Sequence, residues 1–167
     1  MCAAPFKHTV DYTIIQWIRA TLEGHLAAAT LSGLSKRVMV PRGCPQGGVL
    51  SPLLWCLVVD DLITRLNGGG IYTQGYTDDI SLLVVGKFLN TVLGVIQWAL
   101  HTVETWCDKV GLSVNPDKTR LNVFKKKGKL PCSSEPHYFG VTLCCSMLIK
   151  YLGVVLDSRL SCMWMSR

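Results

Sequence analysis

The chain has 167 residues, 49% of them apolar, which is enough to bury the core of one domain or of a piece of one. This composition excludes general disorder, and no uninterrupted apolar run reaches the roughly 18 to 20 residues of a transmembrane helix, so we expect no membrane contact. The mean hydropathy of +0.32 is high for such a domain. We therefore expect protein outside this chain to cover part of its apolar surface.

The net charge of +6 lies entirely in the second half of the chain. Residues 1–84 hold six basic and six acidic side chains, whereas residues 85–167 hold eleven and five. The densest basic segment, Lys118–Lys129, has six basic side chains and no acidic one. It favours a polyanion such as nucleic acid as partner, although a solvated basic turn explains the segment equally well.

Targeting signals and metal-binding cysteine patterns are absent from the sequence. The first ten residues lack the charged head and apolar centre of a secretory signal, which predicts an intracellular protein that is not secreted. The eight cysteines form neither a CxxC pair nor a Cys/His cluster at zinc spacing. We expect free and mostly buried thiols, as apolar neighbours such as those in Trp55-Cys56-Leu57 suggest.

The first predicted elements are a helix and a short strand pair. Asp11–Gly24 places four apolar side chains on one helical face, with Gly24 as the stop. These side chains are Ile14, Ile15, Ile18 and Leu22. Ala27–Leu31 and Lys36–Val40 then read as paired strands around Ser32–Gly33.

A glycine-rich loop leads directly into the next predicted helix. Pro41–Leu50 is too rich in proline and glycine for regular structure. Ser51 followed by Pro52 is a strong helix start, because the serine can cap free amides and proline at the first position loses no needed donor. Apolar residues then recur at helical spacing until Asn67–Gly70. They are Leu53, Leu54, Leu57, Val58, Leu62 and Leu66.

A hairpin and a long helix follow. Ile71–Tyr76 and Ile80–Val85 are β-prone runs that flank Thr77–Asp79, which predicts a hairpin with an acidic turn. Phe88–Val110 is predicted to be an amphipathic helix ended by Gly111. Its apolar positions are Phe88, Val92, Val95, Ala99, Val103, Trp106 and Val110.

The remaining chain is predicted to be β-structure. Strands are expected at Leu112–Asn115 and Arg120–Phe124, and a last hairpin from Tyr138–Leu143 and Leu148–Leu156. The whole order predicts an α+β fold in one unit, with helices packed on one face of a mainly antiparallel sheet.

The adjacent carboxylates of Asp78 and Asp79 repel each other, and a divalent cation would explain why they lie together. Mg²⁺ is commonly held by one or two carboxylates plus substrate phosphates. A solvated turn is the alternative, since aspartate is frequent in turns, and the equally dense pair Asp60–Asp61 is taken as the polar edge of a helix. Nearby features favour the metal, namely the three glycines of the loop 42–48, the amide of Gln46, and Lys118 as a phosphate contact.

At this point four segments resemble the reverse transcriptases, most closely those of non-LTR retrotransposons. Arg42–Trp55 (RGCPQGGVLSPLLW) is similar to motif B of that family, and Tyr76–Asp79 to its YxDD box, motif C. Gly111–Thr119 resembles motif D, and Tyr151–Val154 the motif E grip that steadies the primer end.

The resemblance implies a right-hand polymerase palm, incomplete at both ends, that extends a DNA 3′ end on an RNA template. It implies two Mg²⁺ ions, with Mn²⁺ as an alternative, and RNA template, DNA primer, dNTPs and the remainder of the polymerase as partners in cytoplasm and nucleus. Asp78 and Asp79 would be the catalytic metal ligands. The other implied roles are nucleotide and template binding by Arg42, Gln46, Gly47, Gly48 and Lys118, the last near the leaving pyrophosphate, and primer-end support by Tyr76, Leu152 and Gly153.

The resemblance also divides the chain and raises a question about a third aspartate. Residues 1–130 would be fingers and palm, 137–157 the motif E hairpin, and 158–167 the start of a thumb or an aberrant tail. The family's motif A aspartate should lie on a strand before the first helix, but Asp11 opens a helix and ten residues precede it. We therefore expect a fragment that is inactive alone. The alternatives are a non-catalytic nucleic-acid-binding module that uses the sheet and Lys125–Lys129, or an unselected relic.

Overall fold

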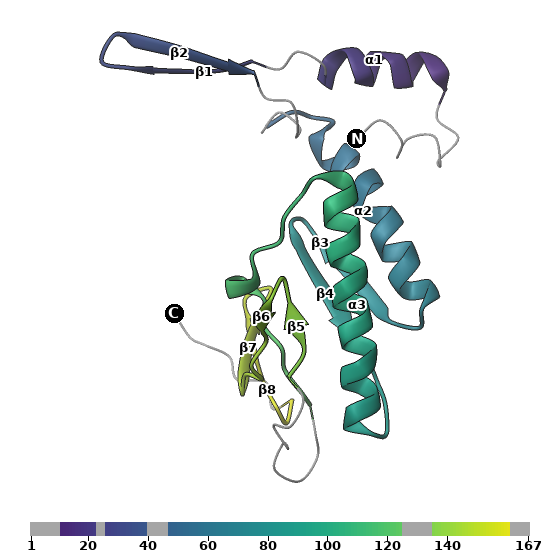
Figure 1. Ribbon diagram of the computed structural model, residues 1–167. Helices are drawn as coiled ribbons and strands as arrows, with labels where there is room; N and C mark the ends of the chain where they lie inside the picture. Colours follow the sequence, from purple (N-terminus) through teal and green to yellow (C-terminus); the bar gives the residue numbers. More distant parts are fainter. Residues whose placement is uncertain (1–10, 23–25, 40–46, 125–134, 161–167) are drawn as a thin grey trace. The chain divides into compact units, whose positions relative to one another are not determined.

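A computed structural model describes residues 11–22, 26–39, 47–124 and 135–160 (Figure 1). The chain divides into two compact units. The first contains the residues up to Gly68 and Thr73–Ser81, and the second contains Gly69–Tyr72 and the residues from Leu82 on. Each unit is described by itself.

The first helix, α1 (Tyr12–Leu22), begins where it was predicted to begin. The Asp11 carboxylate accepts a hydrogen bond from the Thr13 N–H at 2.8 Å, which caps the helix and holds the pKa of Asp11 below its usual value. On the predicted apolar face Ile15 is buried, whereas Ile14 is 51% exposed. The predicted stop, Gly24, lies outside the described residues.

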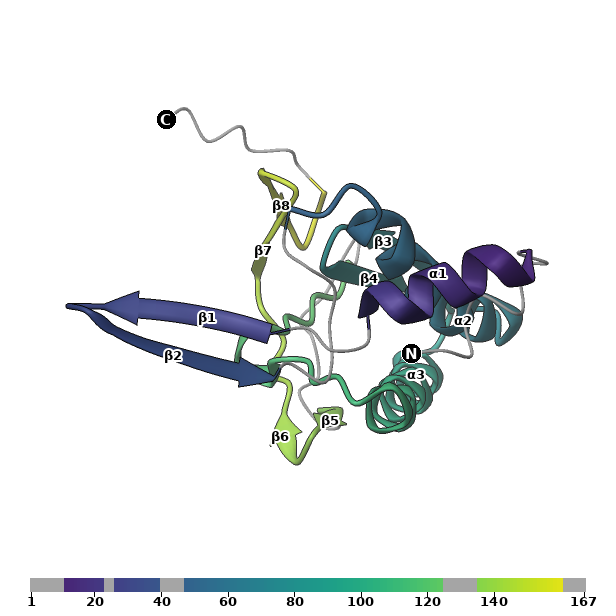
Figure 2. The same ribbon diagram turned by 90° about the horizontal axis from the view of Figure 1, so that it is seen from above.

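Strands β1 (Leu26–Leu31) and β2 (Leu34–Met39) form the predicted antiparallel pair, seen as a two-stranded ribbon in Figure 2. Their turn consists of Ser32 and Gly33, with φ of 51° and 82°. Two positive φ values in a two-residue turn match the right-handed twist of the strands. Every side chain of this ribbon is exposed.

Helix α2 (Ser51–Gly68) confirms the predicted helix after the glycine-rich loop. The Ser51 N–H donates to the Gly48 carbonyl at 3.1 Å, so the loop enters the helix without a spacer. Its core lies in the C-terminal half, where Leu62 and Leu66 are fully buried, whereas Leu53 is 57% exposed. The apolar face of α2 is therefore shorter than the sequence pattern predicted.

The predicted acidic hairpin is present as β3 (Tyr72–Tyr76) and β4 (Asp79–Leu83). Thr77 and Asp78 form its two-residue turn, and Asp79 is the first residue of β4.

In the second unit, α3 (Leu89–Val110) confirms the long amphipathic helix. Gly111 ends it in the left-handed conformation, with φ 69° and ψ 36°, and its N–H donates to the Cys107 carbonyl. Phe88 was predicted to face the core but is 67% exposed, because it precedes the helix as its cap residue. The buried face consists of Leu93, Ile96, Ala99, Leu100, Val103, Trp106 and Cys107.

The four cysteines within the described residues are all free, as predicted, but only Cys107 is buried. Burial raises the pKa of the Cys107 thiol, because the interior disfavours a thiolate. Cys56 and Cys144 are exposed, so the prediction of mostly buried thiols was wrong for them. Apolar sequence neighbours did not place Cys56 inside, since consecutive helical residues point about 100° apart.

The two strands predicted after α3 are absent. Within 112–124 the chain forms only the short 3₁₀ helix η2 (Pro116–Lys118) and one parallel bridge between Leu121 and Cys145. The Asn115 side chain accepts the Asp117 N–H at 2.9 Å and so competes with strand pairing, and Pro116 has no N–H to donate.

The C-terminal region was predicted as one hairpin but forms two. β5 (His137–Tyr138) pairs with β6 (Val141–Thr142), and β7 (Leu148–Tyr151) with β8 (Val154–Asp157). Phe139–Gly140 and Leu152–Gly153 all have positive φ, so each reverses the chain within two residues. The Gln97 side chain of α3 pairs with both the N–H and the carbonyl of His137, at 2.7 and 3.0 Å.

The α+β class is thus confirmed, while the strands of the described residues pair as four separate two-stranded sheets instead of one larger sheet. Among these residues no helix is both long and apolar enough to cross a membrane.

Two glycines of the second unit offer a matched test of packing. A Cβ at Gly86 would lie 2.5 Å from Val92 Cγ2, a stiff branched side chain, whereas a Cβ at Gly94 in α3 would meet no atom within 4 Å. We expect Gly86→Ala to lower the free energy of unfolding by about 1–3 kcal/mol. Gly94→Ala should raise it by about 0.5–1 kcal/mol, because alanine has the higher helix propensity. Urea denaturation of both variants measures the difference, and equal effects would contradict the described Gly86–Val92 approach.

Candidate active site

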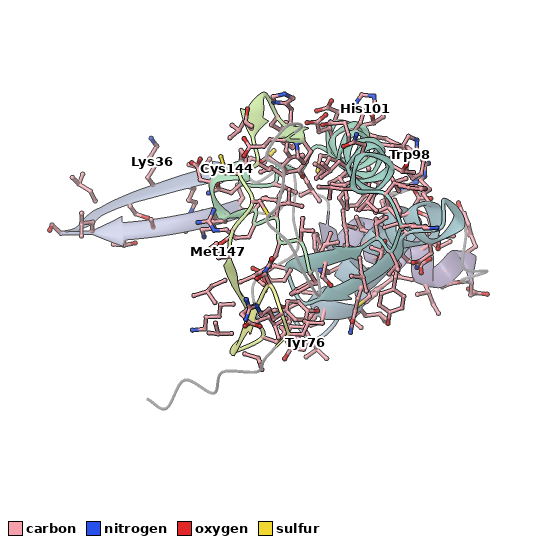
Figure 3. The ribbon with its side chains drawn as sticks, turned by 90° about the horizontal axis from the view of Figure 1, so that it is seen from below. Lys36, Tyr76, Trp98, His101, Cys144 and Met147 are labelled. Atoms are coloured by element: carbon pink, nitrogen blue, oxygen red, sulfur yellow. The ribbon has the colours of Figure 1, made fainter. Side chains whose placement is uncertain are left out.

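The two candidate metal ligands lie at the tip of the β3–β4 hairpin. Asp78 is the second turn residue and Asp79 begins β4, and both are exposed. Tyr76 ends β3 directly before the turn and is 54% exposed (Figure 3). The sequence therefore brings the three predicted side chains of motif C to one exposed turn.

The turn that carries Asp78 contains no glycine. Thr77 has a φ of 49°, which is unfavourable for a β-branched residue. The left-handed conformation costs about 1–2 kcal/mol in a residue with a Cβ. The Thr77 hydroxyl donates to Asp78 Oδ1 at 2.9 Å, and this hydrogen bond restrains the carboxylate.

Helix α2 contacts the hairpin along β3. The indole Nε1 of Trp55 donates to the Thr77 carbonyl, and Asn67 Oδ1 accepts the Thr73 N–H at 2.9 Å. Between them, a Cβ at Gly75 would lie 3.3 Å from Ile63 Cδ1, so the strand backbone lies directly on the helix.

The described part of motif B joins this arrangement through α2. Gly47 is exposed with a φ of 84°, a conformation that favours glycine, and Gly48 leads into the helix. Arg42 and Gln46, predicted to bind nucleotide or template, lie outside the described residues. The first unit thus contains the end of the glycine-rich loop and the acidic turn on one helix–hairpin assembly.

The other predicted site residues belong to the second unit. Lys118 ends η2 and is exposed. Leu152 and Gly153 form the exposed turn between β7 and β8, with φ of 48° and 84°.

The donor set at the acidic turn fits Mg²⁺ in chemistry but contains only two carboxylates. Mg²⁺ prefers hard oxygen ligands, which Asp78 and Asp79 supply. Among the described residues, no group of three His, Cys, Asp or Glu side chains is arranged to hold a metal ion. Before α2 the sequence has two acidic residues, Asp11 and Glu23, and Asp11 caps α1.

Two residues that hold the hairpin on α2 were not singled out from the sequence. Trp55 and Asn67 hold the hairpin on α2 through side-chain hydrogen bonds. Both connect segments that are separated in sequence, so no local motif predicts these contacts. The available signal was their helical spacing, since residues 55, 59, 63 and 67 lie on one side of α2.

The family model "Reverse transcriptase (RNA-dependent DNA polymerase)" matches residues 4–156. The chain belongs to the reverse transcriptase family. The resemblance proposed from motifs B to E is therefore confirmed at the level of the family, and with it membership of a nucleotidyltransferase class of enzymes.

Three similar proteins have names from non-LTR elements. A retrovirus-related Pol polyprotein from type-1 retrotransposable element R1 2 of Nasonia vitripennis is 32% identical over 66% of this chain. A probable RNA-directed DNA polymerase from transposon BS of Drosophila melanogaster is 35% identical over 71% of it, and an RNA-directed DNA polymerase from mobile element jockey of Drosophila funebris is 30% identical over 93%.

The aligned regions cover 27%, 14% and 17% of these reverse transcriptase relatives, respectively. The chain therefore corresponds to a minor part of each. No solved structure matched it.

Proposed function

We propose that the chain forms part of the palm of an RNA-directed DNA polymerase, in which Asp78 and Asp79 are metal ligands. One observation carries the proposal. The exposed acidic turn is hydrogen-bonded to α2, the helix that begins directly after the glycine-rich loop of the family. A solvated turn would not need this support from α2.

The proposed substrates are an RNA template, a DNA primer and dNTPs, and the cofactor is Mg²⁺ or Mn²⁺. Bound ions would polarise the attacking 3′ hydroxyl and stabilise the leaving pyrophosphate. The chain's own residues would bind and orient the primer, the template and the nucleotide. Tyr76 and the Leu152–Gly153 turn support the primer end, and Lys118 meets phosphate charge. The loop residues Arg42, Gln46, Gly47 and Gly48 would border the nucleotide and the template.

We also propose that these 167 residues do not synthesise DNA by themselves. Two adjacent carboxylates are an incomplete anchor for two ions, and the described acidic residue before α2, Asp11, caps α1. Several large apolar side chains are also strongly exposed, among them Val49 at 95%, Leu34 at 81% and Leu31 at 80%. Such exposure fits a surface that the remainder of a polymerase covers.

Primer extension on poly(rA)/oligo(dT) with Mg²⁺ tests both the proposed polymerase role and the proposed inactivity of the chain alone. We expect no extension by the chain alone, and extension after an upstream segment with an aspartate-bearing strand, taken from one of the relatives, is joined to it. Extension by the unmodified chain that depends on Asp78 would contradict the proposed inactivity. If the extended protein binds primer–template with the salt dependence of a polyanion contact but does not polymerise, the chain acts as a binding module instead.

A further inference from the structure

Four residues on one side of α2 contact alternate residues of β3 and of the turn that follows it. They are Trp55, Val59, Ile63 and Asn67, each four positions after the last. Trp55 contacts Thr77, Val59 and Ile63 lie within 4 Å of the Cβ position of Gly75, and Asn67 contacts Thr73. We call this set the α2 row.

The α2 row and the strand run antiparallel, since residue numbers rise along the helix while those of the contacted residues fall along the strand. The twelve residues from Trp55 to Asn67 advance about 18 Å along the helix, whereas the four residues from Thr77 back to Thr73 span about 13 Å of extended chain. Val59 and Ile63 therefore share one partner, Gly75. The two ends of the row hydrogen-bond to the two ends of the segment Thr73–Thr77.

Trp55 occupies the end of the α2 row that reaches the turn. Its indole N–H donates to the carbonyl of Thr77, the residue with the unfavourable φ of 49°. In the other three two-residue turns within the described residues, the first residue also has a positive φ, and the second is a glycine with positive φ, at Gly33, Gly140 and Gly153. In the β3–β4 turn Thr77 alone has a positive φ, and the hydrogen bond from Trp55 supports this residue from outside the turn.

The peptide that Trp55 holds is the one that leads into Asp78. Its orientation determines the position of the Asp78 backbone, and the Thr77 hydroxyl restrains the Asp78 carboxylate at 2.9 Å. We infer that Trp55 is a positioning residue, which fixes the Thr77–Asp78 turn so that the carboxylates of Asp78 and Asp79 can bind a divalent cation. This inference rests on the metal-binding role proposed for Asp78 and Asp79.

The test compares Trp55→Phe, which keeps an aromatic ring but removes the donor, with Asn67→Ala, which removes the hydrogen bond at the other end of the α2 row. Mn²⁺ alone is the probe, and its binding to the full chain is followed by water-proton relaxation. We expect Trp55→Phe to weaken the Asp78-dependent binding by about three- to tenfold, as loss of one hydrogen bond predicts. Asn67→Ala should lower the unfolding midpoint without a change in Mn²⁺ affinity.

Backbone amide resonances of Thr77, Asp78 and Asp79 give a readout that needs no metal. They should move in Trp55→Phe and stay in place in Asn67→Ala. If wild-type Mn²⁺ binding does not depend on Asp78, the metal role fails, while moved resonances would still support control of the turn by Trp55. If Mn²⁺ binds through Asp78 but Trp55→Phe changes neither affinity nor resonances, or if both variants weaken binding equally, the positioning role is overturned.

Discussion

Asp78→Asn is expected to slow primer extension by about a thousandfold in the chain joined to its upstream segment. Asparagine keeps the shape of the side chain and an oxygen that can accept from the Thr77 hydroxyl, so the turn should persist. The substitution removes the negative charge of a proposed metal ligand. Metal stabilisation of the transition state is worth several kcal/mol, and a loss of about 4 kcal/mol corresponds to this factor. Steady-state extension rates at saturating Mg²⁺ measure it.

The control for Asp78→Asn is Asp60→Asn in the other acidic pair. Asp60 and Asp61 lie on α2, and Asp61 pairs with Arg65 at 3.1 Å across one helical turn. Removing the charge of the partly exposed Asp60 should leave extension within about twofold, since charge pairs on a helix surface contribute only tenths of a kcal/mol. Equal losses in the two variants would indicate a general effect of charge and would contradict a specific role for Asp78.

Leu62→Ala should produce the largest loss of stability, about 2–5 kcal/mol in the free energy of unfolding. The Leu62 side chain is fully buried in the described structure. Truncation removes apolar contacts and leaves a cavity that the surrounding residues fill only in part. Urea denaturation followed by circular dichroism gives the change.

Leu53→Ala provides the comparison within the same helix. Leu53 is 57% exposed, so its truncation should change the free energy of unfolding by less than about 0.5 kcal/mol. If both variants lose the same stability, the buried face of α2 does not lie where the structure places it.

Local signals in the sequence predicted the helices and the first two hairpins. Gly111 ends α3 as expected, and Ser32–Gly33 turns β1 into β2. The same signal, a glycine as the second residue of a two-residue turn between β-prone segments, is present at Phe139–Gly140 and Leu152–Gly153. It would have predicted two C-terminal hairpins instead of one. The strands expected within 112–124 failed because side-chain hydrogen bonding by Asn115 competes locally with pairing, which apolar content does not reveal.

The acidic turn could be predicted because Asp78 and Asp79 are adjacent in sequence, and the family comparison confirms the family to which the chain belongs. Its support could not. The Trp55–Thr77 contact spans 22 positions, and only the packing of α2 on β3 brings its partners together. The roles of Lys118 and of the Leu152–Gly153 turn stay predictions, since both lie in the second unit.

The contacts between the α2 row and the segment Thr73–Thr77 limit how this part of the chain can vary in length during evolution. One residue inserted within α2 would rotate the following part of the row by about 100° and separate Asn67 from its strand partner. One residue inserted in β3 would reverse which side chains face the helix. The connection Gly69–Gly70 belongs to neither element, so length variation among descendants of this sequence should accumulate there and spare both elements.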